Sequence, residues 1–456
     1  MTTEFINPCG FGFSPSASGQ DNTRALQAAA DQGGTIRIER PGIYKMAGTV
    51  YLTSHTRLVF GAGVFLQKVK EPDVFTHLLL NRGALTKTRD RNIAVEGLHL
   101  LVNGVDQRSS EVFGLRGQVA FFYVDDLRIS GFRCLDLEAS QFAIHVCTFS
   151  DLLIEDVIIE GLKDGVHLGR GRRFTIRDCV LKTADDAIAL NAHDYATSNP
   201  ELGWLEDGLV ENIHDLPHPR ATGFFCRLLA GAWSDWRPGM QVQQSDSVVS
   251  QGRLYRVQAE PDGTTYTSNT PPTHNQGNQV LDQINWGMVQ SEAVYSAGVR
   301  NVAFRNISLE TPRVGFSIHF DQDRHSRSYY PAAALPVQGG LSFDNIRVKF
   351  PEERPLLSIK TPVAAITIAN SFLGGGGIHF NPVADLPDSG RTSLALLGCA
   401  FTVPGNLDLV INRVPGKRIS LATVGSHFSH DDFAARVEAG QGSIDCRSDL
   451  PGLLDK

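Results

Sequence analysis

The chain has 456 residues, and 42% of them are hydrophobic, so it can form a sizeable core and is not a disordered segment. Its formal net charge of −7 argues against a basic nucleic-acid-binding surface, and it lacks the run of about 18 apolar residues that a membrane helix needs. The 44 glycines and 22 prolines against only 4 methionines favour many short strands joined by turns. We therefore expect an all-β protein that binds neither nucleic acid nor membrane.

The first predicted element is a helix over 21–30, where Asp21 is an N-cap candidate before a run of strong helix formers. Gly33 and Gly34 end this helix, and 35–38 starts the strands. A solenoid needs its open end covered, and a short helix provides such a cap. The N-terminal residues lack the basic and apolar regions of a secretory signal, which predicts a cytoplasmic location.

A unit of alternating apolar residues then recurs at a spacing of 22–28 residues. The anchor residues of successive units are Ile129, Ile154 and Ile176 in the first half, and Phe343, Ile368, Leu396 and Leu421 in the second. Leucine-rich repeats share this period, but their fixed Leu/Asn ladder is missing here. The spacing favours a right-handed parallel β-helix in which each coil stacks about 4.8 Å above the last.

One stretch, 217–290, interrupts the repeat and predicts a small inserted β module between two β-helix parts, 1–216 and 291–456. It contains Trp233, Trp236 and Trp286, and its sequence resembles the small chitin- and cellulose-binding modules, which implies that these rings bind substrate. Two alternatives remain open at this point. The rings could form the core of the module, or they could contribute to an interface in a homo-oligomer.

The sharpest chemical signal is a set of three aspartates. Asp164 and Asp186 are 22 residues apart, which equals the local coil length, so their carboxylates should lie on adjacent rungs roughly 5 Å apart. Asp185 flanks them. Crowded carboxylates favour one that keeps a proton, and an acid beside a base is what glycosidic bond cleavage needs. The same triad would also suit Ca²⁺, and a lone Asp at a strand end often only caps a turn.

Other polar residues recur at coil spacing and are predicted to line a substrate-binding cleft. The alternative for each is an ordinary solvated sheet face. The candidates are His145 and His167 (22 residues apart), Asn191, His193 and Asp194 after the Asp185–Asp186 strand, His319 and Lys360 in later coils, and Asp321, Asp323 and Arg324 after His319.

The pattern Asp164-Gly165 followed by Asp185-Asp186 and small and apolar residues resembles the family 28 glycoside hydrolases (polygalacturonases and rhamnogalacturonases) of the pectin-lyase-like superfamily. The resemblance implies that Asp185 protonates the leaving oxygen. It implies that Asp186 and Asp164 position and deprotonate a water, which gives inversion, with no cofactor and no metal.

The sequence departs from the family pattern at several places. Leu162-Lys163 replaces the usual Asn-Thr, and Ala184 stands where the family has Gly. The family's Gly-His-Gly motif is expected near 284–287, where no His stands, and its Arg-Ile-Lys motif corresponds to 317–319, which reads Ser-Ile-His. These departures leave a neutral sugar as reasonable a substrate as a galacturonide.

The leading interpretation is therefore an inverting glycoside hydrolase that acts on an oligo- or polysaccharide. One alternative is a polysaccharide lyase or glycan transferase on the same fold, with His319 or Lys360 as base and the aspartates holding Ca²⁺. Another alternative is a non-catalytic, glycan-binding solenoid.

Overall fold

A computed structural model describes residues 5–107, 111–258, 262–322, 326–350, 354–374, 376–383, 390–401, 409–428, 435–437 and 442–448. The chain forms two compact units, one of residues 1–189 with 208–223 and the other of 190–207 with 224–456. Both contain coils of parallel strands, and the predicted right-handed parallel β-helix with a capping helix and an inserted β module is confirmed. Among the described residues, no helix has the length and apolar character needed to cross a membrane.

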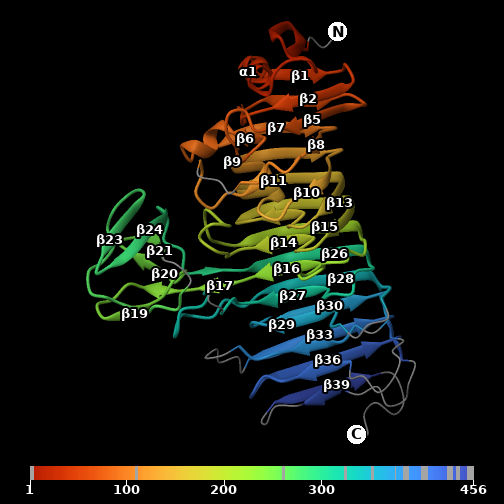
Figure 1. The fold of residues 1–456 in the computed structure, drawn as a ribbon. Coiled ribbons are helices and arrows are strands. Elements are labelled where there is room, and N and C mark those ends of the chain that lie inside the picture. The colour runs from red at the N-terminus through yellow and green to blue at the C-terminus, as the bar shows by residue number, and fades with distance from the viewer. Residues whose placement is uncertain are drawn as a thin grey trace. The chain divides into compact units, whose positions relative to one another are not determined.

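The first unit is built from coils whose strands pair in parallel with those one coil away (Figure 1). One ladder is β1 (Gly34–Ile38), β4 (Thr56–Phe60), β7 (Asp90–Glu96), β9 (Gly117–Ser130), β11 (Phe142–Gly161) and β13 (Gly171–Thr183). The other strands here are β2 (Gly42–Met46), β3 (Val50–Leu52), β5 (Val64–Lys68), β6 (Leu79–Asn81), β8 (His99–Leu101), β10 (Arg133–Leu137) and β12 (Val166–Leu168). Two strands cross the boundaries between the units, namely β14 (Ile188–Asn191) and β15 (Leu205–Asp215).

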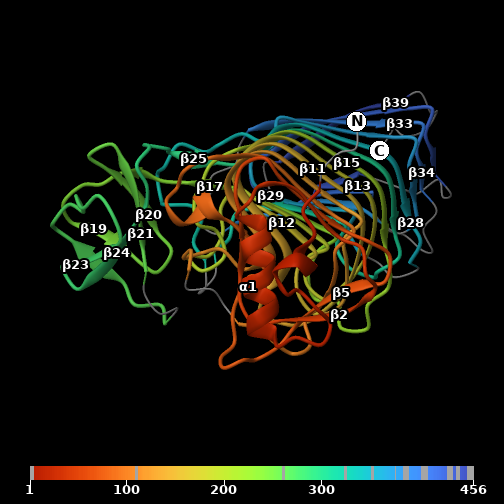
Figure 2. The same cartoon turned by 90° about the horizontal axis from the view of Figure 1, so that it is seen from above.

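Helix α1 (Gly19–Ala30) covers the N-terminal end of this unit (Figure 2), between the short 3-10 turns η1 (Pro8–Phe11) and η2 (Arg82–Leu85) in chain order. The helix starts earlier than predicted, because Ser18 and not Asp21 is its N-cap. The Ser18 hydroxyl accepts a hydrogen bond from the Asp21 N–H and donates one to the Asp21 carboxylate at 2.7 Å. The cap therefore satisfies a free helix donor and holds an acidic side chain in the first turn.

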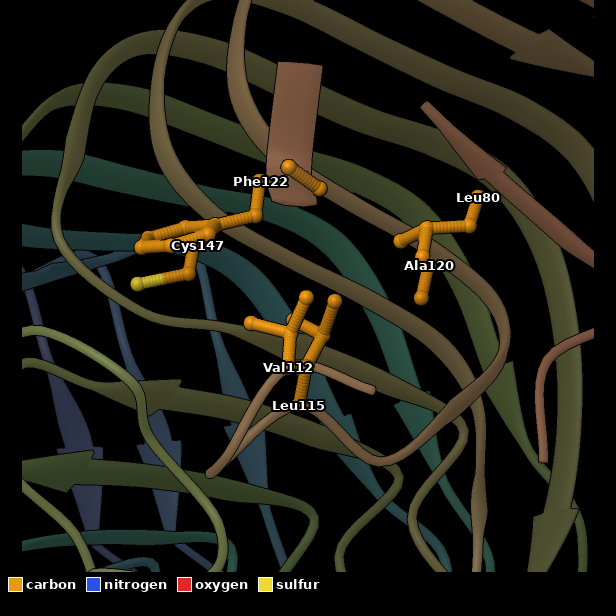
Figure 3. Packing of buried hydrophobic residues seen from close by; sticks show 7 residues of the cluster. Leu80, Val112, Leu115, Ala120, Phe122 and Cys147 are labelled. Atoms are coloured by element: carbon orange, nitrogen blue, oxygen red, sulfur yellow. The ribbon is translucent and has the colours of Figure 1, made fainter. Parts of the chain in front are cut away.

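Inward-facing apolar residues stack from coil to coil, as the sequence spacing predicts. Ile129, Ile154 and Ile176 pair in register and are fully buried. A second buried apolar cluster, most of it labelled in Figure 3, consists of Leu80, Ala84, Val112, Leu115, Ala120, Phe122 and Cys147. The last predicted anchor is wrong by two residues, because Leu396 pairs with Thr423 and Leu421 pairs with Leu394. Residues two apart on a strand face the same side, so the apolar column survives the shift.

The coil strands of the second unit form three parallel ladders. The first is β16 (Cys226–Leu229), β27 (Phe316–His319), β29 (Leu357–Lys360), β32 (Ile378–Phe380), β35 (Val410–Asn412) and β38 (Ala435–Val437). The second is β26 (Val299–Leu309), β28 (Gly339–Val348), β30 (Ala365–Ala369), β33 (Arg391–Leu397), β36 (Arg418–Val424) and β39 (Ser443–Ser448). The third is β31 (Phe372–Leu373), β34 (Ala400–Phe401) and β37 (His427–Phe428).

The inserted module belongs to this second unit and starts later than the predicted 217, because β16 is still a coil strand. A two-stranded antiparallel neck, β17 (Gly231–Ala232) with β25 (Ser296–Ala297), leads into and out of it. Its strands form a five-stranded sheet and a separate antiparallel pair. The sheet is β18 (Ser234–Asp235), β20 (Ser247–Ser250), β21 (Arg253–Val257), β24 (Ile284–Gln290) and β23 (Asn278–Leu281), and the pair is β19 (Met240–Val242) with β22 (Tyr266–Ser268).

Candidate active site

The three predicted aspartates lie together in the first unit. Asp164 occupies the turn between β11 and β12, and Asp185 and Asp186 occupy the equivalent turn between β13 and β14. The Gly165 N–H donates to the Asp186 carbonyl at 3.0 Å, which places the two turns on adjacent rungs. One carboxylate oxygen from each aspartate lies within 4.8 Å of the others. The 22-residue spacing thus predicts the contact correctly.

Two glycines allow this close approach. A Cβ on Gly165 would lie 2.7 Å from the Ala187 carbonyl oxygen, and a Cβ on Gly223 would lie 2.5 Å from the Asp185 carbonyl carbon. Both distances are shorter than side chains tolerate. The backbone around the acidic turns therefore needs glycine at these positions, for lack of space rather than for an unusual φ angle.

A lysine sits among the carboxylates. Lys163 forms an ion pair with Asp185, and its Nζ lies 3.7 Å from Asp164 Oδ1. The Asp185 side chain is 30% exposed, whereas Asp164 and Asp186 are buried. An opposite charge at this distance favours the ionised carboxylate. In the sequence, Lys163 stands out only as a departure from the Asn-Thr of the family pattern. Nothing in the sequence indicates that it pairs with the acidic triad.

His167 and His145 are fully buried and stack in register on adjacent coils, as predicted. His167 Nδ1 lies 2.8 Å from Asp164 Oδ2, and its ring stacks on Phe142 with centroids 4.1 Å apart. His145 Nδ1 accepts the Arg116 N–H at 3.0 Å. Neither imidazole is open to solvent. His167 therefore contacts Asp164 from the protein interior, and the His145 ring contacts that of His167.

The environment fixes the charge of Asp164. Burial alone would raise the pKa of its carboxyl, but Lys163, the hydrogen bond with His167 and the charge of Arg116 outweigh it and hold that pKa at about 2. Burial and the adjacent His167 lower the pKa of His145 well below its usual value. Asp164 is therefore a carboxylate at neutral pH and suits the role of a base or water-positioning group rather than an acid.

The remaining predicted residues of this kind belong to the second unit, where Asn191, Asp194, His319 and Asp321 form a buried network around Arg227. Arg227 contacts Asp321 Oδ2 at 2.6 Å and Asp194 Oδ1 at 3.9 Å. Asp194 accepts a hydrogen bond from Asn191 at 2.6 Å, and Asp321 Oδ1 lies 3.2 Å from the His319 ring. Arg227 was missed because it stands on β16, inside the segment assigned to the insert.

Charges within this network are largely matched. Burial would raise the pKa of Asp321, but Arg227 and the neighbouring His319 lower it below the usual range. Burial and the nearby Arg256 lower the pKa of His193 to about 3, and neither of its ring nitrogens has a hydrogen-bond partner among the described residues. Lys360 is exposed and pairs in register with His319. Asp323 and Arg324 lie outside the described residues.

The tryptophans of the insert differ in exposure. Trp286 is fully buried in β24, and Trp233 is 2% exposed and donates its Nε1–H to the Val294 carbonyl. Trp236 is half-buried and donates to the Ser268 hydroxyl at 2.8 Å. Because a ring must present a face to stack on a sugar, the burial of Trp233 and Trp286 favours the core alternative for these two.

The expected position of the Gly-His-Gly motif is wrong. Residues 284–287 lie on β24, which pairs antiparallel with β21 and β23 inside the module and is not a coil strand. The coil strand before β27 is β16, in register so that Arg227 pairs with Ser317 and Leu229 with His319. The segment that leads into β16 carries Phe224 and Phe225. The stretch 223–229, which leads into and forms β16, therefore contains no histidine and carries Arg227.

The geometry above defines the class to which the fold belongs, that of the right-handed parallel β-helix proteins. No known family profile matches the chain. One curated relative, named a probable polygalacturonase from Arabidopsis thaliana, is 32% identical over 87 residues. The match covers 18% of this chain and 18% of that protein, so it is local.

Solved structures share the fold over nearly the whole chain. A family 87 α-1,3-glucanase catalytic unit from Streptomyces thermodiastaticus has a TM-score of 0.54 at 13% identity and covers 99% of this chain and 69% of its own. A Streptococcus pneumoniae surface adhesin has a TM-score of 0.53 at 11% identity, and the match covers 97% of this chain and 100% of the adhesin chain. A family 28 exopolygalacturonase from Yersinia enterocolitica has a TM-score of 0.52 at 10% identity, and the match covers 99% of this chain and 79% of that enzyme. At such identities the likeness establishes the fold, which both enzymes and an adhesin use.

Proposed function

We propose that this protein is a glycoside hydrolase that cleaves a glycosidic bond in an oligo- or polysaccharide by acid–base catalysis at Asp164, Asp185 and Asp186. The observation that carries the proposal is the set of three carboxylates from adjacent coils within 4.8 Å of one another, two buried and one open to solvent. The local likeness to a polygalacturonase and the motif resemblance to family 28 support the same chemistry.

In the proposed mechanism, Asp185 protonates the leaving oxygen because it is the exposed member of the triad. Asp164 and Asp186 hold a water and accept its proton, which gives inversion at the anomeric carbon. Asp164 suits this role because its low pKa keeps it ionised. Lys163 must leave Asp185 when the saccharide binds, since an ion-paired carboxylate is a poor acid.

The alternative lyase reaction has one observation in its favour, because three convergent carboxylates are a donor set that Ca²⁺ accepts. Lys163 argues against it, since its ammonium pairs with Asp185 and lies 3.7 Å from Asp164, and its positive charge opposes the binding of a divalent cation. Hydrolysis creates a new reducing end, whereas elimination creates an unsaturated product with ultraviolet absorbance. Activity that survives EDTA without such absorbance supports hydrolysis.

The decisive experiment is a reducing-sugar assay on a broad oligosaccharide panel with wild type, Asp186→Asn and the control Asp126→Asn. Asp126 is an exposed aspartate of the same unit with φ 54°, a conformation that Asn also tolerates. We expect Asp186→Asn to lose about 10²–10⁴-fold in rate and the control to keep full activity. Equal activity of both variants would overturn the assignment, as would no turnover of any substrate by the folded wild type.

Two finer features complete the proposal. The short carboxylate separation also resembles a retaining pair, in which the second carboxylate attacks the sugar directly. The anomer released first, read by proton NMR, decides between this outcome and the proposed inversion. We further propose an exo-acting enzyme that works on imported oligosaccharides in the cytoplasm, and a product profile of random internal cleavage would contradict this mode.

A further inference from the structure

The second unit contains a cavity of about 400 Å³ that none of the proposed chemistry uses. Its walls come from the start of the inserted module, from Thr265 and from the segment 327–331. This segment is fixed to the neck of the module, because the Tyr330 N–H donates to the Ala232 carbonyl at 2.8 Å. The cavity volume falls within the roughly 300–1,000 Å³ of small-molecule sites.

The lining combines hydrogen-bonding groups with small apolar surfaces. Gln243 Nε2 donates to the Thr265 hydroxyl at 2.7 Å, and the Tyr330 hydroxyl donates to the Gln241 carbonyl at 3.2 Å. Met240 and the prolines at 238 and 331 supply apolar surface between these groups. Amides and a hydroxyl next to apolar patches match the alternating C–H faces and hydroxyls of a pyranose ring.

The cavity also carries a net positive charge. Arg327 contacts the fully buried Asp246 at 3.0 Å, and burial raises the pKa of the Asp246 carboxyl to about 7, so this carboxyl offsets the charge of Arg327 only in part at neutral pH. Arg237 lines the same cavity, is exposed, and forms no ion pair with any residue that the structure describes. Arg237 therefore presents an exposed guanidinium to the cavity, and a guanidinium binds a carboxylate with charge-assisted hydrogen bonds.

We propose that this cavity is an accessory binding site for a single monoanionic saccharide unit of the uronate type, with Arg237 on its carboxylate and the glutamine and threonine side chains on its hydroxyls. The site does not depend on the hydrolase proposal, because its lining includes none of the three aspartates. If the protein is a hydrolase, this cavity would hold an acidic saccharide in addition to the one at the three aspartates. If the protein is not an enzyme, this cavity would be its proposed saccharide-binding site.

Methionine methyl NMR tests the proposal at the cavity itself. The chain has only 4 methionines, and Met240 lines the cavity whereas Met46 and Met288 do not. Full-length protein labelled at the methionine methyls is titrated with galacturonate, galactose and acetate, after Met240→Leu has assigned the reporter signal. We expect galacturonate to shift the Met240 methyl, with galactose and acetate each binding about five- to tenfold more weakly because each offers half of the contacts.

Two charge-matched variants locate the binding. Arg237→Gln should weaken galacturonate binding about five- to tenfold, whereas Arg305→Gln, an exposed arginine of β26 outside the cavity, should leave it unchanged. An unmoved Met240 methyl at saturating galacturonate would overturn the proposal. Equal binding to wild type and Arg237→Gln would do the same, and equal binding of acetate would show a simple anion site with no recognition of the sugar. None of these readouts uses catalytic activity, so the cavity proposal and the hydrolase proposal fail independently.

Discussion

His167 Nδ1 lies 2.8 Å from Asp164 Oδ2, with both side chains closed off from solvent. Because the Asp164 carboxyl has a pKa of about 2, the proton of this contact belongs to the imidazole, which therefore donates. The sequence predicted His167 as a substrate-binding residue. From its burial and its contact with Asp164 we propose that it is instead a positioning residue that acts through the carboxylate.

Replacing His167 by leucine should lower kcat about 10–100-fold and change KM little, because the substrate does not touch this ring. His167→Asn keeps a donor near the Nδ1 position and should recover part of the rate. In His167→Leu the pKa of Asp164 rises, so the acidic limb of the kcat/KM profile moves to higher pH. Steady-state kinetics across pH measure all three effects.

The matched control for this prediction is His99→Leu, a half-buried histidine of β8 whose ring contacts Phe65 and no aspartate. It should leave the profile unmoved. A purely structural role for His167 would appear as the same loss in His167→Leu and His167→Asn with no shift of the acidic limb.

Removing the ammonium at Lys163 should make Asp185 easier to protonate. In Lys163→Met, the carboxyl that we propose as the acid loses its ion pair, so the basic limb of the kcat/KM profile moves to higher pH. The variant should also bind Ca²⁺ more tightly, since the ammonium that pairs with Asp185 and lies 3.7 Å from Asp164 is then gone. Calorimetric titration with CaCl₂ measures the second effect.

Lys182→Met provides the comparison, because Lys182 lies in the same unit and pairs with Glu160 at 2.7 Å rather than with an aspartate of the triad in the ion pairs of the described residues. It should change neither the profile nor Ca²⁺ binding. If Lys163→Met behaves like Lys182→Met, Asp185 does not act as the acid.

The sequence correctly predicts contacts that depend on a constant coil length. The predictions fail where an insert interrupts the regular coils. Asp164 meets Asp186, and His145 meets His167, because a 22-residue period brings equal positions to adjacent rungs. Arg227 was missed because the insert has no repeat period, so the sequence does not show at which residue the coils end and the insert begins. The ion pair of Lys163 was missed for a different reason, since it depends on where a flexible side chain lies.

The stacked corners of the coils allow a separate test of stability. Asn345 has φ 53°, and its amide donates to Asn306 Oδ1 at 2.9 Å on the adjacent coil. Asn345→Val should lower the free energy of unfolding by about 2–3 kcal/mol, because a β-branched residue is strained at positive φ and the hydrogen bond is lost. Asn345→Gly should cost only about 1 kcal/mol, since it removes the side-chain hydrogen bonds with Asn306 and Arg347 at a half-exposed site but adds no strain at positive φ. Urea unfolding of both variants measures the difference, and equal losses would contradict the role of the backbone angle.

A buried lysine predicts how stability depends on pH. Lys68 is fully buried, and its ammonium donates to the Thr76 carbonyl and to Gln118 Oε1, both at 2.8 Å. Burial lowers its pKa from 10.5 to about 7, an effect that Asp106 partly opposes. Between these two values the unfolded chain holds the proton more tightly than the folded one. The folded state therefore gains stability as pH rises through this range, by at most about 5 kcal/mol.

Lys68→Met removes this proton, so the stability of wild type relative to the variant should increase between pH 7 and pH 10. Urea midpoints of both proteins at several pH values measure it, because all other titrations are common to the pair and cancel. Lys45→Met, at an exposed position on the neighbouring strand β2, should show no such trend against wild type. A difference between wild type and Lys68→Met that stays constant across this range would mean that Lys68 remains protonated in the folded chain, held by its two oxygen acceptors.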